Sequence, residues 1–123
     1  MSSKNVDLGK NGESIAATHA LANGYNVIAK NVRTPAGEID LILEKDGTLV
    51  FAEVKTRSGY SYGFPEEAIT ESKLQHMIDA ATHYLIELNP IPDWRLDVIS
   101  IELYQGKRTQ PVIHWIENVS ADR

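Results

Sequence analysis

The sequence predicts a mixed α/β domain with a single mixed sheet and flanking helices, in the element order αβββαββ. Three observations support this class: two segments with helical apolar spacing, five segments rich in β-branched and apolar residues, and turn residues between them. A chain of 123 residues has the length of one domain. We therefore expect one domain over 1–123, with a core at about 9–117 and a polar, frayed tail at 118–123.

The first half of the chain is expected to form a helix and three strands. The helix begins near 9–11 and ends at about Ala22, because Asn23-Gly24 is a typical helix stop. Asp46-Gly47 is a strong hairpin signal between the second and third strands. The three strands share an apolar, β-branched composition and are expected at 25–32, 38–43 and 48–55.

The second half is expected to form a loop, a long helix and two strands. The loop covers 56–65, and its aromatic, glycine-rich part either covers a substrate or packs against the core. The helix begins at Pro65 or Thr70 and ends at Asn89, before a proline. The last two strands are expected at 95–104 and 112–117.

Composition and charge exclude several classes of protein. The chain has no cysteine, which excludes disulfides and thiolate zinc sites. It has no apolar run long enough for a membrane helix, and its first residues do not form the apolar core of a signal peptide. We expect a cytoplasmic protein with no membrane partner. The net charge of −5 argues against nonspecific coating of nucleic acid and leaves room for a local basic site.

The Asp-Gly hairpin predicts which side chains face each other. In a two- or four-residue loop, Asp40 lies directly opposite Glu53, and Glu38 lies opposite Lys55. Strand side chains alternate, so these four residues project from one face. A three-residue loop would shift the register by one residue and separate them.

Two opposed carboxylates repel each other unless a proton or a cation lies between them. A hard divalent cation such as Mg²⁺ or Mn²⁺ suits carboxylate oxygens, whereas zinc fits less well without cysteine or a nearby histidine. Lys55 would reach the same place, where an ammonium orients water or stabilises a developing phosphorane. The alternative is a solvated strand surface in which Glu38 and Lys55 form an ordinary ion pair.

The spacing from Asp40 to Glu53-Val54-Lys55 resembles the PD-(D/E)xK signature of restriction-endonuclease-like nucleases. The surrounding motifs, together covering about 9–115, are more specific and resemble the YraN-type family of small, uncharacterised bacterial proteins. That family is grouped with the restriction-endonuclease-like fold and is similar to archaeal Holliday-junction resolvases. The motifs are, in order, 12–13, 24–25, 31–33, 37–42, 50–57 and 95–99.

The resemblance implies a role for each matching residue. Asp40 and Glu53 match the acidic metal ligands, and the carbonyl of Val54 is expected as a third ligand. Lys55 matches the catalytic lysine, and Glu13 matches the helical glutamate that completes resolvase-like sites. Glu38 lies in the family's GEID run without a defined role. The chain departs from the signature in having isoleucine where the naming proline stands, and in its acidic balance.

Other polar residues have two interpretations each. Four basic residues bracket the expected site and either contact phosphates or are simply solvated: Lys30, Arg33, Arg57 and Lys73. The four histidines show no metal-binding spacing, and both tryptophans are expected in packing. Asp97 is expected to order Arg95 or Arg33.

The leading hypothesis is a Mg²⁺- or Mn²⁺-dependent nuclease. We expect DNA rather than RNA as its substrate, with branched or processed structures as candidates. One alternative is a non-catalytic nucleic-acid-associated module that keeps the metal site as a scaffold. Another is a structural domain that binds a protein partner. We also expect a symmetric homodimer, because resolvase-like enzymes pair two sites to cut two strands.

Overall fold

The computed structural model describes residues 2–58, 69–103 and 110–120, and within the first range it describes the side chains of 11–57. These ranges form a single mixed sheet of five strands with two helices, in the order αβββαββ, which confirms the predicted fold class. The helices are α1 (Ser2–Ala22) and α2 (Glu71–Leu85). The strands are β1 (Asn26–Thr34), β2 (Gly37–Lys45), β3 (Thr48–Ser58), β4 (Asp93–Leu103) and β5 (Val112–Ile116).

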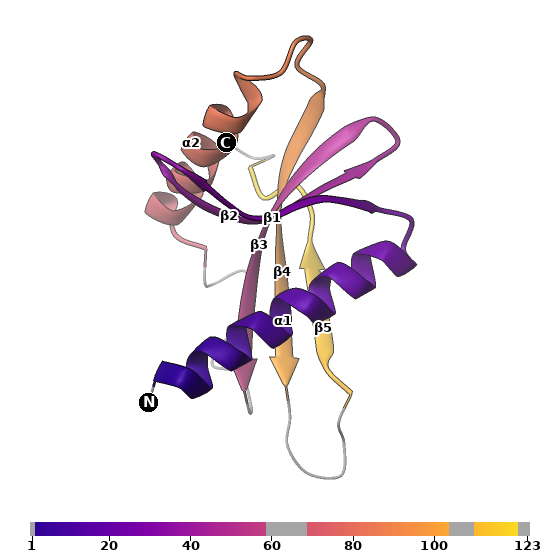
Figure 1. Cartoon of the computed structure of the whole chain (residues 1–123), viewed down its shortest axis with the longest axis vertical. Helices are drawn as coiled ribbons and strands as arrows, with labels where there is room; N and C mark the ends of the chain where they lie inside the picture. Colours follow the sequence, from indigo (N-terminus) through magenta and orange to yellow (C-terminus); the bar gives the residue numbers. More distant parts are fainter. Residues whose placement is uncertain (1, 59–68, 104–109, 121–123) are drawn as a thin grey trace.

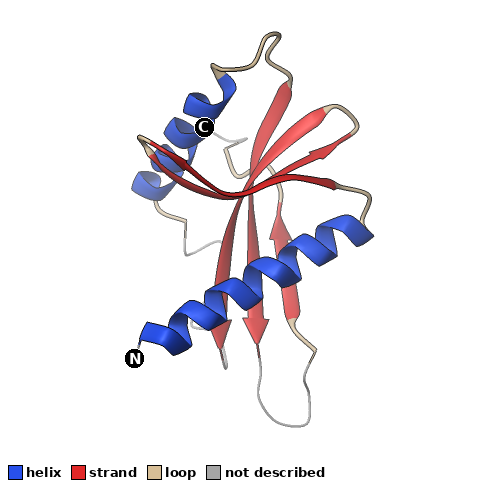
Figure 2. Cartoon of the chain, in the orientation of Figure 1, coloured by secondary structure: helices blue, strands red, loops and turns tan. Residues whose placement is uncertain are grey.

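The strands follow one another across the sheet in sequence order. All neighbours are antiparallel except β3 and β4, which are parallel. A parallel pair needs a long crossover, and α2 lies in that connection. Figures 1 and 2 show α1 lying diagonally across the strands, while α2 lies near the other end of the sheet. The two helices pack against separate hydrophobic clusters, one on each face of the sheet.

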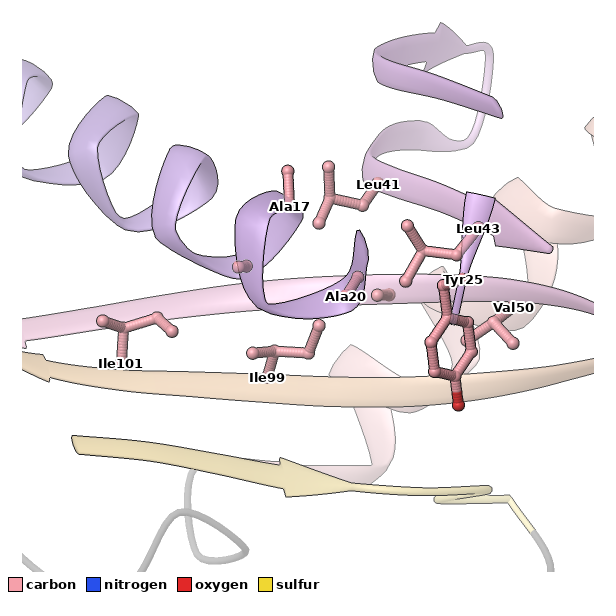
Figure 3. Close-up of a cluster of buried hydrophobic side chains, with 10 residues drawn as sticks. Ala17, Ala20, Tyr25, Leu41, Leu43, Val50, Ile99 and Ile101 are labelled. Atoms are coloured by element: carbon pink, nitrogen blue, oxygen red, sulfur yellow. The ribbon is translucent and has the colours of Figure 1, made fainter. Parts of the chain in front are cut away.

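The α1 face of the sheet is covered closely because the helix presents small residues. Ala16, Ala17 and Ala20 are buried against Leu41, Leu43, Val50, Ile99 and Ile101 (Figure 3). Gly12 crosses β3 so closely that an added Cβ atom would overlap the side-chain oxygen of Thr56. This close crossing sets where the next residue of α1, Glu13, meets the sheet.

The α2 face contains the second cluster. Leu74, Ala81 and Leu85 of the helix pack against strand residues that include Phe51 and Leu96. Thr70 caps the helix, because its side-chain oxygen accepts a 3.0 Å hydrogen bond from the backbone N–H of Lys73. The cap fixes the first turn of α2 beside the sheet.

Several predicted boundaries were wrong. The first helix begins at Ser2 and not near 9–11, because glycine and asparagine inside a helix cost only about 1 kcal/mol and do not stop it. Residues 56–58 of the predicted loop at 56–65 belong to β3, which stays paired with β4 to Ser58. The second helix begins after Thr70, which is one of its two predicted starts, but it ends at Leu85, about one turn before Asn89. Glu87 and Leu88 donate to carbonyls three residues back, so the α-helical hydrogen-bond pattern has stopped by then.

The expected fraying of the tail was also wrong at its start. The backbone N–H of Asn118 donates to Asp97 at 2.9 Å, and that of Val119 donates to the carbonyl of Leu96 at 2.8 Å. Val119 also packs against the α2-side cluster. The aromatic part of the expected loop lies outside the described residues.

Candidate functional site

The sheet forks between β2 and β3. Their ladder follows the predicted register from Lys45 opposite Thr48 to Leu41 opposite Ala52, and it ends there. Beyond that point β2 stays paired with β1 on its other side, and β3 stays paired with β4. Figure 1 shows the β1–β2 ribbon turning away from the long strands β3 and β4. The prediction that Asp40 lies directly opposite Glu53, and Glu38 opposite Lys55, was therefore wrong: the strands separate one residue too early.

Asp40 lies at the base of this fork. Its Oδ2 accepts a 2.8 Å hydrogen bond from the backbone N–H of Val54. Because β2 has separated from β3 at this point, the backbone of β2 no longer provides a carbonyl for the Val54 N–H, and the Asp40 side chain accepts this hydrogen bond instead. The side-chain oxygen thus satisfies a backbone N–H that the ladder leaves unpaired, and this hydrogen bond holds the carboxylate between the two strands.

The surroundings of Asp40 disfavour its charge. Burial raises the pKa of Asp40 to about 6, and the neighbouring carboxylates of Glu53, Glu13 and Glu38 add to the rise. The hydrogen bond from Val54 acts in the opposite direction without cancelling it. A carboxyl group with this surplus of negative neighbours is a favourable place for a cation.

Glu53 is in a different electrostatic environment. Leu49 and Phe51 of β3 face α2, so alternation places Glu53 and Lys55 on that face too. Glu53 Oε2 lies 2.8 Å from Lys73 Nζ and 3.5 Å from Lys55 Nζ. The hydrogen bond to Glu53 raises the pKa of Lys73, although burial acts in the opposite direction. Two ammonium groups thus neutralise the second carboxylate.

Two further carboxylates approach from the edges of the site. Glu13 follows the Gly12 crossing on α1, and its charge contributes to the raised pKa of Asp40. Glu38, on β2, is half-exposed and lies 3.9 Å from the exposed Arg33. A pocket between β2, β3 and α2 has Glu38 and Glu53 in its lining and otherwise apolar walls that include Phe51, Met77, Ala80 and Leu96.

The donors at the fork suit a hard divalent cation. Asp40 and Glu53 offer carboxylate oxygens, the type of ligand that Mg²⁺ and Mn²⁺ prefer. Within 2–58, 69–103 and 110–120, no group of three or more acidic or histidine side chains is arranged to hold a metal. Metal binding there would therefore need two carboxylates completed by backbone, water or substrate oxygens. The Val54 carbonyl as a third ligand stays a prediction.

The four predicted basic residues separate into two groups. Lys73 lies in the cluster and contacts Glu53. Lys30 and Arg33 lie on β1, exposed, with Lys30 beside Leu41. Arg57 lies two residues beyond Lys55 on β3, beside Glu102 of β4. The structure thus brings one of the four into the cluster of carboxylates.

Two features of β4 were underestimated. Ser100 lies beside Lys55 in the parallel ladder, is 1% exposed, and its hydroxyl has no hydrogen-bond partner in the part of the chain that the structure describes. A single polar residue inside the apolar run 98–101 is the signal that could have identified it. Asp97 accepts a hydrogen bond from Arg95, which was one of its two expected partners. On the neighbouring strand β5, Trp115 stacks on Tyr25 with ring centroids 4.9 Å apart.

Fold and site define a small α/β domain with carboxylate and lysine side chains gathered at a forked sheet. Residues 12–101 match the model of the uncharacterised protein family UPF0102. A UPF0102 protein of Desulfitobacterium hafniense is 39% identical over 97% of this chain and 100% of its own length. Another, from Symbiobacterium thermophilum, is 47% identical over 77% of this chain and 81% of its own length. The chain belongs to the UPF0102 family, which confirms the YraN-type resemblance.

The description of the family as uncharacterised assigns no activity to its members. Among the described residues, no helix is long and apolar enough to cross a membrane.

Proposed function

We propose that this protein is a Mg²⁺- or Mn²⁺-dependent nuclease that hydrolyses phosphodiester bonds in DNA, with branched or processed structures as its substrates. The observation that supports it best is the position of Asp40 in the fork, where its charge is disfavoured by burial and by three neighbouring carboxylates. A carboxyl group whose charge is disfavoured in this way, with lysines beside it, is typical of catalytic and binding sites and uncommon in purely structural clusters.

Each residue has a role in this proposal. Asp40 and Glu53 would hold the metal, and Glu13 would shape the site from α1. The bound cation would neutralise charge on the phosphate and activate water. Lys55 would orient the water and stabilise the negative charge that develops at phosphorus. The water oxygen forms a bond to phosphorus, one ester oxygen leaves, and the proton lost by water balances the proton gained by the leaving oxygen.

Cleavage assays test the proposal directly. Purified protein with Mn²⁺ is incubated with plasmid, single-stranded, flap and four-way-junction DNA. We expect Mn²⁺-dependent cleavage of at least one of these, and its loss in Asp40→Asn and in Glu53→Gln. Absence of cleavage from every substrate, or equal cleavage by Asp40→Asn, would contradict the proposal.

A second candidate is a non-catalytic nucleic-acid-associated module with a residual metal site. It is favoured by the two lysines that already neutralise Glu53, and by the net charge of −5. This candidate predicts that Mn²⁺ raises the melting temperature and that DNA binds, without any strand being cut.

The proposal extends to assembly and location. A symmetric homodimer would present two sites to the two strands of one substrate, and the edge strands β1 and β5 are available as contact surfaces. Sedimentation equilibrium tests this, and a single 13.7 kDa species with and without DNA would exclude it. We place the protein in the cytoplasm, in agreement with the absence of cysteine.

A further inference from the structure

The Lys73 side chain is held against the candidate site from a separate element. It lies in the first turn of α2, where the Thr70 cap binds its backbone N–H. Its Nζ lies 2.8 Å from Glu53 Oε2, which is closer than the 3.5 Å between the same oxygen and Lys55 Nζ. Lys73 is thus the closest cationic partner of Glu53 among the described residues.

The charges around the fork favour only some combinations of ligands. Four carboxylates influence the site, namely Asp40, Glu53, Glu13 and Glu38, and two ammonium groups oppose them. A divalent cation that binds Glu53 must displace Lys73 from it or share the carboxylate with it. A displaced ammonium loses its closest anionic partner, and a shared carboxylate makes two positive groups close neighbours.

A phosphodiester removes this conflict. Its anionic oxygens would bind the divalent cation and also accept hydrogen bonds from the displaced ammonium. The four-carbon side chain of Lys73 is 35% exposed, so it has room to move from Glu53 to a phosphate nearby. Lys55 is similarly exposed, at 37%, but it extends from the same strand as Glu53 and its Nζ lies farther from Glu53 Oε2, at 3.5 Å.

We infer that Lys73 is an internal counter-cation of Glu53 that weakens metal binding in the absence of nucleic acid and moves to the substrate phosphate when metal and DNA bind together. This inference rests on the proposed function. It makes metal binding and DNA binding mutually dependent, because each ligand improves the affinity of the other by the same factor. Lys73 is then a positioning and coupling residue.

Mn²⁺ binding tests the inference without a cleavage readout. Free Mn²⁺ is measured by electron paramagnetic resonance during titration of the full chain, with and without a phosphorothioate four-way junction. In Lys73→Gln we expect Mn²⁺ to bind the free protein about 10-fold more tightly, a change equivalent to a single lost charge contact. The junction should strengthen Mn²⁺ binding to the wild type, and it should do so much less in Lys73→Gln.

Two variants serve as controls. Lys45→Gln removes the same charge from the exposed end of the β2–β3 hairpin, where the amine donates to the carbonyl of Asn23, and should leave Mn²⁺ affinity unchanged. Lys73→Arg keeps the charge and should retain the weak metal binding and the coupling. Circular dichroism of each variant checks that the fold is kept.

The outcomes separate the two proposals. If Glu53→Gln binds Mn²⁺ as the wild type does with the junction present, no metal binds at the fork and the proposed function is wrong. If Glu53→Gln abolishes binding while Lys73→Gln matches the wild type with and without the junction, the metal site stands and the role of Lys73 is wrong. Equal effects of Lys73→Gln and Lys45→Gln would also overturn it.

Discussion

Two largely buried aspartates in this protein have opposite environments. Asp97 on β4 is 0% exposed and accepts hydrogen bonds from the Arg95 guanidinium, the Trp115 indole at 2.8 Å and the Asn118 backbone at 2.9 Å. Within the described residues, Asp40 accepts a hydrogen bond from one backbone donor and lies near three carboxylates whose charges oppose its own. A buried carboxylate with every donor supplied stabilises the fold, whereas one among like charges is suited to receive a ligand.

Asp97 also affects the pKa of Arg95, the cation that it binds. Burial acts against the charge of Arg95, but the hydrogen bonds and charge of Asp97 hold the pKa of Arg95 above its usual value. A further hydrogen bond, at 2.8 Å, joins Arg95 to the Tyr25 hydroxyl. The cluster therefore joins β4, β5 and Tyr25, the residue that precedes β1.

The largest effect we expect is from Asp97→Asn. It removes one charge of a buried pair and turns an amide group toward donors, so the free energy of unfolding should fall by about 3–5 kcal/mol. Urea denaturation measures this, with Asp93→Asn, on the exposed start of the same strand, as the matched control. A loss no larger than that of the control would remove the distinction between the two aspartates.

The next largest effect concerns the reaction. Lys55→Ala should lower turnover by at least about 10²-fold, as expected for a lost donor to the transition state. Mn²⁺ should bind the variant at least as tightly, because removing an ammonium 3.5 Å from Glu53 does not weaken a cation site. Single-turnover cleavage and Mn²⁺ titration measure the two effects separately, and full activity in the variant would exclude Lys55 from the mechanism.

A smaller effect is expected from Gly12→Ala. Alanine normally stabilises a helix relative to glycine, but here its Cβ would overlap Thr56, so stability should fall by about 1–3 kcal/mol. Ser14→Ala, at an exposed position of the same helix, should be neutral or stabilising. Thr56→Ala should recover part of the loss in the double variant, and a stabilising effect of Gly12→Ala alone would contradict the close crossing.

Local signals in the sequence were sufficient for most of the fold. Asp46 and Gly47 both adopt positive φ in the hairpin turn, as their residue types favour, and this turn sets the β2–β3 register. The stop at Asn23-Gly24 was also correct, with Gly24 at a φ of +88°. Each of these depends on a few adjacent residues.

Adjacent residues in the sequence could not predict where β2 and β3 separate, or that Lys73 contacts Glu53. The apolar alternation of β2 continues past Leu41 without a break, so it gives no sign that the ladder with β3 ends there. The separation depends on contacts between distant elements, including Ile39 with the α2-side cluster. The contact of Lys73 with Glu53 likewise depends on where the crossover places α2, although Thr70 as a helix cap was a visible signal.

The smallest effect we expect is a pH-dependent difference in the free energy of unfolding between the wild type and Asp40→Asn. The folded-state pKa of about 6 lies above the ordinary 3.8, so the folded protein binds this proton more tightly than the unfolded chain does. Its contribution to stability is therefore full below about pH 4 and is lost as the pH rises through about 6. Asp40→Asn lacks this loss, so above pH 6 the metal-free variant should be more stable than the wild type by a few tenths to about 1 kcal/mol.

Urea denaturation in chelator between pH 4 and pH 7 measures that difference, which cancels the titration of the other carboxylates. Glu53→Gln is the comparison, because it removes a carboxylate already neutralised by lysines and should not gain stability. With saturating Mn²⁺ the order should reverse above pH 6, since only the wild type gains binding energy from the metal. A pH-independent difference between Asp40→Asn and the wild type would mean that Asp40 is held as a structural carboxylate, as Asp97 is.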